Sequence, residues 1–171
     1  FYSKGGKSLY DVDQRAKISV AEGAVSESGL ADFEQIQVDR YMKGKKLYDF
    51  GGIRLYNENQ LGVSMIKYLE DNFKMYHLLF TNPRLDKKGY NKYMSSREMY
   101  YKNRLNNPSN VMRDSITAIR YDYHPRAIPL EWKDYQDVEY SDELLEIYKD
   151  RYSNAADFDL YLVGNFDKKE L

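Results

Sequence analysis

The side chains that could bind a metal ion or transfer protons are few in this sequence. It contains two histidines, His77 and His124, and no cysteine. His77 falls on the apolar stripe of a predicted helix, where we expect a structural histidine. His124 belongs to the segment Tyr123-His124-Pro125-Arg126, a rigid loop with a cation beside the imidazole. Because a zinc site needs three or four converging ligands, which two distant histidines do not offer, we predict no metal ligand and no catalytic residue.

Two carboxylates, Glu22 and Glu27, are the other candidates for acid–base chemistry. Paired carboxylates can act as general acid and base when they face one another. These two stand five residues apart and so do not share a helix face, and neither has a basic or metal-binding neighbour in the sequence. We expect both to face solvent or to cap a neighbouring element. Gly5-Gly6 lacks the pattern of a phosphate loop and predicts only a tight turn.

Residues 84–104 combine positive charge with aromatic rings. The window holds seven basic residues against two acids, interleaved with four tyrosines: Arg84, Lys87, Lys88, Lys92, Arg97, Lys102 and Arg104, against Asp86 and Glu98, with Tyr90, Tyr93, Tyr100 and Tyr101. Such a surface can hold single-stranded nucleic acid through phosphate contacts and stacking. The alternative is a solvated helix face or a contact with a partner domain, its charge balanced by residues 131–171, with twelve acids against five bases. Without a recognisable nucleic-acid fold, we predict no nucleic-acid partner.

Composition indicates a single domain with room for a real core. The 171 residues carry 26 basic and 27 acidic side chains, and the net charge of −1 argues against a general polyanion binder. No apolar run approaches the roughly 20 residues that cross a bilayer, so we expect no membrane span. Because tyrosine combines a large apolar ring with a polar hydroxyl, the 18 tyrosines suit partly solvated surfaces and interfaces. Phe1-Tyr2-Ser3 resembles the end of a strand. We therefore expect the sequence to be a fragment of a longer polypeptide that lacks a preceding strand.

The element expected to position the other residues is a central helix over residues 11–30. Asp11 and Asp13 suit its start, where carboxylates meet free N–H groups, and Gly29 suits its end. Apolar residues recur at steps of three to five along one narrow face: Val12, Ala16, Ala21, Ala24 and Val25. Because small residues fill the middle of this helix, it can approach its neighbours closely, and we expect it to be buried.

The remaining pattern predicts strands and blocks of helices. Helices are expected over residues 31–44, 66–80 and 86–104, from residue 108 to before Pro125, and from residue 141. Residues 45–65 predict two antiparallel strands around the turn formers Asn57-Glu58-Asn59, with Gly51-Gly52 as a competing turn or a bulge. A loop follows over residues 123–137, and a final strand is expected over residues 158–163. The order indicates the α+β class, an antiparallel sheet with helices packed on one face.

The flanks of the central helix resemble a known metallopeptidase region. Residues 3–10 read Ser-Lys-Gly-Gly-Lys-Ser-Leu-Tyr, and residues 26–30 read Ser-Glu-Ser-Gly-Leu. They are similar to the segments on either side of the H-x-x-E-H helix in the insulinase/pitrilysin-type zinc peptidases, the inverzincins. Counted back from Gly29, the two histidines and the glutamate of that motif fall on Val20, Ala24 and Gly23. None of these residues can bind zinc or activate a metal-bound water, so the site is absent.

Five later segments resemble further landmarks of this family, in the same order. They are Thr81-Asn82-Pro83-Arg84, Asn106-Asn107-Pro108, His124-Pro125-Arg126, Asn154-Ala155-Ala156-Asp157-Phe158 and Val163-Gly164-Asn165-Phe166-Asp167. The resemblance therefore covers nearly the whole chain. It implies a truncated metallohydrolase fold similar to that of the mitochondrial processing peptidase.

The resemblance also implies a function. Family members pair a zinc-bearing half with a metal-free half of similar fold, closed around a peptide. Residues 1–171 would then be one non-catalytic domain of a bacterial zinc protease that encloses and binds peptide substrate. Hydrolysis would occur in a separate catalytic domain of the same polypeptide, so zinc is expected there and no cofactor in this fragment.

The family also supplies candidate contacts, a compartment and an alternative. Its counterpart of the loop after residue 120 lies near the peptide groove, which makes His124 and Arg126 the candidate substrate-binding residues. Relatives suggest the bacterial periplasm or cell envelope, with the cytoplasm also open. The alternative function is a scaffold or protein-interaction domain that has no catalytic partner.

Overall fold

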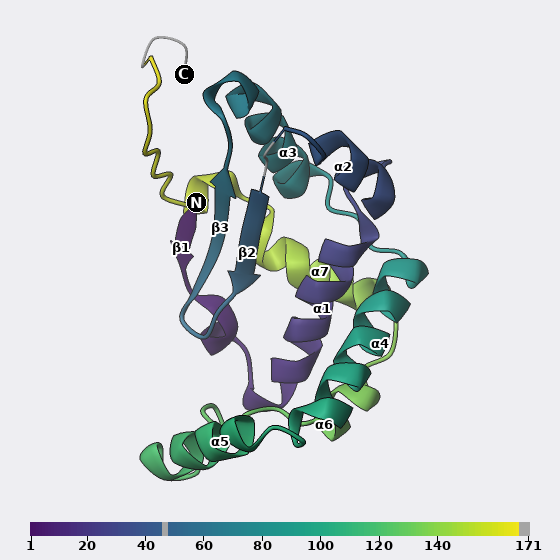
Figure 1. The fold of residues 1–171 in the computed structure, drawn as a ribbon, viewed down its shortest axis with the longest axis vertical. Helices are drawn as coiled ribbons and strands as arrows, with labels where there is room; N and C mark the ends of the chain where they lie inside the picture. Colours follow the sequence, from purple (N-terminus) through teal and green to yellow (C-terminus); the bar gives the residue numbers. More distant parts are fainter. Residues whose placement is uncertain (46–47, 168–171) are drawn as a thin grey trace.

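The computed structural model describes residues 1–45 and 48–167, which combine helices with a small antiparallel sheet. The helix α1 lies between that sheet and α4 (Figure 1). The strands are β1 (Tyr2–Lys4), β2 (Tyr48–Ile53) and β3 (Asn57–Val63). The α-helices are α1 (Arg15–Ser28), α2 (Gln35–Met42), α3 (Leu69–Thr81), α4 (Lys87–Arg104), α5 (Pro108–Arg120), α6 (Trp132–Gln136) and α7 (Asp142–Tyr152). Short 3-10 turns span Gly6–Leu9, Val12–Gln14, Ile66–Tyr68 and Ala155–Asp157.

The sheet has the order β1-β3-β2, and its hairpin turn differs from the prediction. The chain turns at residues 54–56, so Asn57-Glu58-Asn59 open β3 instead of forming the turn. The reason is a buried contact, because the Glu58 carboxylate accepts a hydrogen bond from the Gly6 amide at 2.5 Å and lies 3.8 Å from Arg151. The pairing of β2 with β3 runs without a break through Gly51-Gly52, which are neither a turn nor a bulge.

The predicted final strand over residues 158–163 is wrong. Tyr2 and Asp159 exchange two backbone hydrogen bonds of 2.9 and 2.8 Å, and this single bridge is the only strand-like pairing there among the described residues. Beyond Asp159 the backbone has no neighbouring strand to pair with in the described chain, so it stays irregular. Phe158 instead joins an aromatic core, with its ring 5.2 Å from Phe80 and 5.7 Å from Tyr152.

The central helix is buried, as predicted, but its buried surface is wider than the expected face. It begins at Arg15, after a 3-10 turn that Asp11 and Gln14 cap, and it ends at Gly29 with φ of 98°. Val12 lies outside the core. The buried residues also include the neighbours of the apolar set, because α4, α7 and β2 surround α1: Ala16, Ile18, Ser19, Val20, Ala21, Ala24, Val25 and Ser28.

Two glycines allow α1 and α4 to lie very close together. At Gly23 an added Cβ would overlap the ring of Tyr93 on α4. At Gly89, on the first turn of α4, an added Cβ would overlap Ser28 of α1. Glycine usually weakens a helix interior, by about 1 kcal/mol relative to alanine. Here it is the residue that permits the close packing of the two helices.

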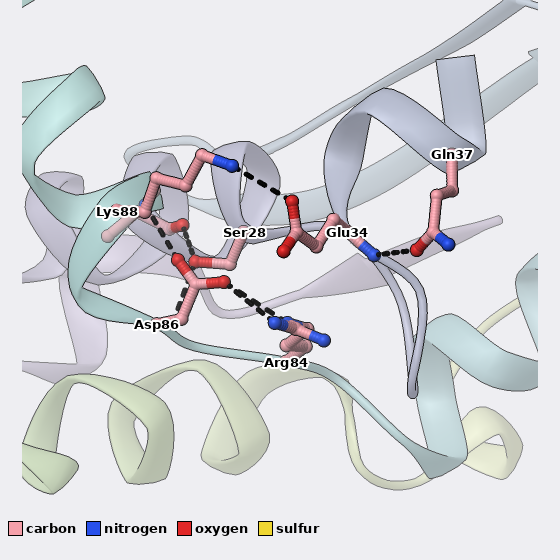
Figure 2. A network of polar contacts seen from close by, with 8 residues as sticks. Ser28, Glu34, Gln37, Arg84, Asp86 and Lys88 are labelled. Carbon is pink, nitrogen blue, oxygen red and sulfur yellow. Dashed lines mark hydrogen bonds and ion pairs between the residues drawn. The ribbon is translucent and has the colours of Figure 1, made fainter. Parts of the chain in front are cut away.

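A polar network fixes the start of α4 to the end of α1. Figure 2 shows Asp86 at its centre. The Asp86 carboxylate accepts hydrogen bonds from the Gly89 amide at 2.7 Å and from Arg84 at 3.0 Å. The hydroxyl of Ser28 accepts the Asp86 amide at 2.9 Å and donates to the Ala24 carbonyl at 2.7 Å. Asp86 is thus the cap of α4, and its backbone is tied directly to α1.

Two helices with apolar residues are less buried than their patterns suggest. The predicted apolar residues of α5, Val111, Met112, Ile116 and Ile119, are all exposed in the described chain. Phe33, just before α2, and Ile36, on its first turn, are also exposed. None of the described helices combines the length and the apolar character that crossing a bilayer requires.

We predict that Gly23→Ala destabilises the fold. Overpacking against Tyr93 should outweigh the gain in helix propensity and give a net loss of about 1–3 kcal/mol. Urea unfolding measures this loss. Ser26→Ala, at an exposed position of the same helix, is the matched control and should be nearly neutral.

A double-mutant cycle tests the cause. In a Tyr93→Ala background the methyl group at position 23 has room, so the loss from Gly23→Ala should largely vanish. An equal loss in both backgrounds would show that the ring is not what requires glycine.

Candidate functional site

The positions of α1 on which the resemblance would place the zinc motif are packed into the interior. Val20 and Ala24 are fully buried, and the space beside Gly23 is taken by the ring of Tyr93. Across residues 1–45 and 48–167, no group of three or more His, Cys, Asp or Glu side chains is arranged to hold a metal ion. His77 faces outward from α3, whose buried residues are Asn72, Tyr76 and Phe80, so its predicted place on the apolar stripe is wrong.

The two candidate substrate-binding residues lie in one turn but do different things. His124 is exposed, and its Nδ1 accepts a hydrogen bond from the Arg126 amide at 3.2 Å. The Arg126 guanidinium donates to the carbonyls of Tyr10 and Lys7 at 2.8 and 3.3 Å. Arg126 therefore ties the loop after α5 to the N-terminal segment. It also lines a cleft beside α1, whereas His124 does not.

This cleft is the candidate functional site. It has a volume of about 410 Å³ and lies between α1, α4, the β2–β3 turn and the loop before α6. Pockets that bind small ligands run from roughly 300 to 1,000 Å³, so its size is sufficient. Five of its described lining residues are cations, and one is a carboxylate: Lys7, Arg15, Arg54, Arg97 and Arg126, against Glu22.

The five cations make no close ion pair with the described carboxylates, although the charge of Glu22 acts on Lys7 and that of Asp134 acts on Arg15. None of them forms an ion pair within the part of the chain that the structure describes. Arg15 is held instead by the carbonyls of Pro125 and Ile128, at 2.5 and 3.0 Å. Lys7 donates to the Ser19 hydroxyl at 2.7 Å. These neutral acceptors fix the side chains in place without neutralising their charge.

Glu22 lines this cleft, so the expectation that it faces solvent is wrong, whereas the alternative contact with a neighbouring element is present as a hydrogen bond from the Ile53 amide. Burial raises the pKa of Glu22, although the charge of Lys7 and a hydrogen bond from the Ile53 amide act in the opposite direction. Burial also lowers the pKa of Lys7, and the cations of Arg15, Arg54 and Arg97 lower it further despite Glu22. Glu27 has a basic partner as well, Lys92 at 2.5 Å.

Tyr93 and Arg97 form the α4 side of the cleft. The Arg97 guanidinium lies 4.9 Å from the centre of the Tyr93 ring, a cation–π contact that fixes its plane. Burial raises the pKa of Tyr93 to about 12, so the phenol is neutral at ordinary pH. Since the two residues are four positions apart on α4, they share one face of that helix.

A second cavity adjoins the first one. It has a volume of about 360 Å³ and shares Glu22, Gly23, Tyr93 and Arg97 with the cationic cleft. Its lining is mixed, with apolar side chains from α2 and α3 beside polar ones: Val38, Met42, Met75 and Leu79 are among the apolar residues, and Glu27, Gln35 and Gln60 are among the polar ones. The two cavities adjoin at their shared residues along α1 and β2, and together we call them the α1–β2 groove, with one cationic end and one end of mixed lining.

Most of the cations in the basic window over residues 84–104 have carboxylate partners close by in the structure. Five of its described cations pair with carboxylates: Arg84 with Asp86, Lys88 with Glu34, Lys92 with Glu27, Lys102 with Glu98 and Arg104 with Asp114. The predicted balance by residues 131–171 is therefore wrong for these five, because their partners lie on or near α1, α2, α4 and α5. Tyr93 is buried and Tyr90 donates to the Val138 carbonyl at 2.6 Å, so these two rings pack inward.

Sequence patterns alone miss most of the cleft. Arg126 is singled out in advance, and Lys7 falls within the Gly-rich segment of residues 3–10. Arg97 is noted only as one cation of the basic window over residues 84–104. Arg15 and Arg54 carry no local signal, because they come from elements that only the fold brings together. Glu22 is missed because its basic neighbours are far away in the sequence.

Comparison with known proteins places the fold. No protein-family model matches the chain, and no curated protein matches it either. Among solved structures it is similar to the periplasmic protease PqqL from Escherichia coli, with a TM-score of 0.69 and 16% identity over 91% of this chain. It is also similar to the ferredoxin protease FusC, in a structure of a mutant in complex with Arabidopsis ferredoxin, with a TM-score of 0.65 and 18% identity over 89% of this chain. The chain spans 17% of the length of each protease, and the likeness is one of fold.

We predict that replacing Glu22 changes how stability depends on pH. Because its pKa in the folded state lies above the ordinary 4.5, the unreplaced carboxyl adds stability below that pH and loses it as the pH rises through the folded-state pKa. Glu22→Gln lacks this titration. Its stability relative to the unsubstituted chain should therefore increase with pH and then level off.

Urea unfolding from about pH 4 to pH 8 measures the difference. Glu139→Gln removes an exposed carboxylate and is the matched control. A Glu22→Gln difference that follows the control, or that falls as the pH rises, would contradict the burial of this carboxylate.

Proposed function

We propose that this chain is a non-catalytic unit of a zinc-dependent peptidase. Its role is to form part of the wall that encloses and binds a peptide, while a separate metal-bearing domain of the same polypeptide cuts the peptide bond. One observation carries the proposal. About nine-tenths of the chain follows the fold of two proteases, while Val20, Gly23 and Ala24 stand where the resemblance expects the zinc motif.

The packing of α1 supports the non-catalytic role. A histidine at position 20 or 24 would replace a buried aliphatic residue, and a glutamate at position 23 would overlap the Tyr93 ring. The helix face that would present a metal site is therefore committed to the core. The zinc of the parent protein belongs in its catalytic half, and the bacterial periplasm or cell envelope is the proposed compartment, since PqqL is periplasmic.

The α1–β2 groove supports peptide binding. In the described sheet β2 is an edge strand that pairs with β3 on one side. Its other side faces the groove, where the Ile53 amide donates to Glu22. The Gly51 amide points the same way, because strand amides alternate with a period of two. An extended peptide can add to such an edge by main-chain hydrogen bonds.

The exposed apolar face of α5 favours the alternative, a scaffold or protein-interaction domain. Val111, Met112, Ile116 and Ile119 lie on the surface without a covering element among the described residues. A patch of this kind suits a protein partner. It is compatible with contact to another domain of the same polypeptide, so we place it second.

We predict that the purified chain retains no stoichiometric zinc after dialysis and cleaves no peptide. It should still bind extended peptides, because the groove does not depend on a metal ion. Elemental analysis, a fluorogenic peptide library with and without chelator, and fluorescence anisotropy measure these three properties.

The outcomes separate the two functions. One zinc per chain, or cleavage that a chelator abolishes, would overturn the non-catalytic role. A metal-free chain that binds no peptide would favour the scaffold.

A further inference from the structure

The charge of the α1–β2 groove is unbalanced at one end. Five cations line the cleft against the single carboxylate of Glu22, counting the lining residues that the structure describes. Elsewhere on the described surface, by contrast, ion pairs are common, as at Lys17 with Glu143 and Lys45 with Asp71. A local excess of positive charge in a partly desolvated cleft raises the local concentration of anions.

The cations keep hydrogen-bond donors available. A guanidinium has five N–H donors, and Arg15 and Arg126 each use two of them on backbone carbonyls. Lys7 has three donors and uses one on Ser19. Arg97 is oriented by its contact with Tyr93. The donors that remain are therefore pre-positioned, which reduces the entropy lost when a ligand binds.

We propose that the cationic end of the groove binds a carboxylate of the peptide, either its C-terminal carboxylate or an acidic side chain. This inference rests on the proposed peptide-binding function. Guanidinium groups match the planar geometry of a carboxylate with two parallel hydrogen bonds. The apolar part of the adjoining cavity, formed by Val38, Met42, Met75 and Leu79, takes an apolar side chain of the same peptide.

A single carboxylate fits this end better than a nucleic-acid strand does. Glu22 lies within the cleft and would repel a series of phosphates. Stacking of bases needs free aromatic faces, and the Tyr93 ring is already in contact with Gly23 and Arg97. The edge of β2 beside the cleft, at the Gly51 amide, also offers pairing for a peptide backbone, which a sugar–phosphate chain cannot use.

Three labelled peptides with one apolar, uncharged sequence test the proposal by fluorescence anisotropy. The first ends in a free carboxylate, the second in an amide, and the third in an amide with two glutamates added. Because a charge-assisted hydrogen bond outweighs a neutral one, a carboxylate should tighten binding by about tenfold or more. Tightening confined to the first peptide identifies the C-terminus as the ligand, and tightening of the third identifies an acidic side chain.

Matched variants locate the contact. Arg54→Gln combined with Arg97→Gln should abolish the advantage of the carboxylate peptides over the neutral amide. Arg113→Gln combined with Arg120→Gln removes the same charge from the exposed surface of α5 and should preserve the advantage. Arg54→Gln alone changes an exposed position of the β2–β3 turn, so it keeps the test decisive if the double variant does not fold.

Each contrary result has a distinct meaning. Equal binding of all three peptides, or unchanged binding by the arginine variants, overturns the carboxylate site and leaves peptide binding intact. Tighter binding of a single-stranded oligonucleotide, lost in the same variants, overturns it in favour of nucleic acid. Failure of every peptide to bind overturns this inference and the proposed function together.

Discussion

The close approach of α1 and α4 is the constraint on which the rest of the structure depends. Gly23 and Gly89 lack the side chains that would hold the helices apart, and Tyr93 and Ser28 fill the space. Once Tyr93 lies over α1, Arg97 on the next turn of α4 must lie beside Glu22, the neighbour of Gly23. The α4 wall of the groove is thus a consequence of packing two helices at a glycine.

The same contact explains why one helix can resemble a metal-binding element and yet serve another purpose. A zinc motif needs polar side chains that project from a helix into an open site. On α1 that surface is buried, with Val20 and Ala24 in the core and the Tyr93 ring against Gly23. The polar residue beside it, Glu22, reaches the edge of β2 through the Ile53 amide. The carboxylate that α1 presents to the groove is therefore that of Glu22, one residue before Gly23.

Local patterns predict the elements of this chain better than they predict their contacts. The burial of α1, its end at Gly29 and the caps of α4 and α5 follow from short-range rules, and the structure bears them out. The hairpin turn is misplaced because Asn57-Glu58-Asn59 has turn composition, while burial of Glu58 under Gly6 and Arg151 overrides it. The final strand fails because a strand exists only where a neighbour pairs with it. The cleft depends on contacts between distant segments, which periodicity does not encode.

The unfavourable electrostatic energy of the cationic cleft is the strongest argument that the cleft has a function. Cations in a partly desolvated cleft repel one another, and the lowered pKa of Lys7 shows that burial and its cationic neighbours both disfavour its charge. A fold selected for stability alone would place carboxylates among them, as it does around α4 for Lys88 and Lys92. Here the acceptors are neutral carbonyls and a hydroxyl, which hold Arg15, Arg126 and Lys7 without reducing their charge. Departures from local consistency of this kind concentrate at functional sites, and the proposed peptide carboxylate would supply the missing negative charge.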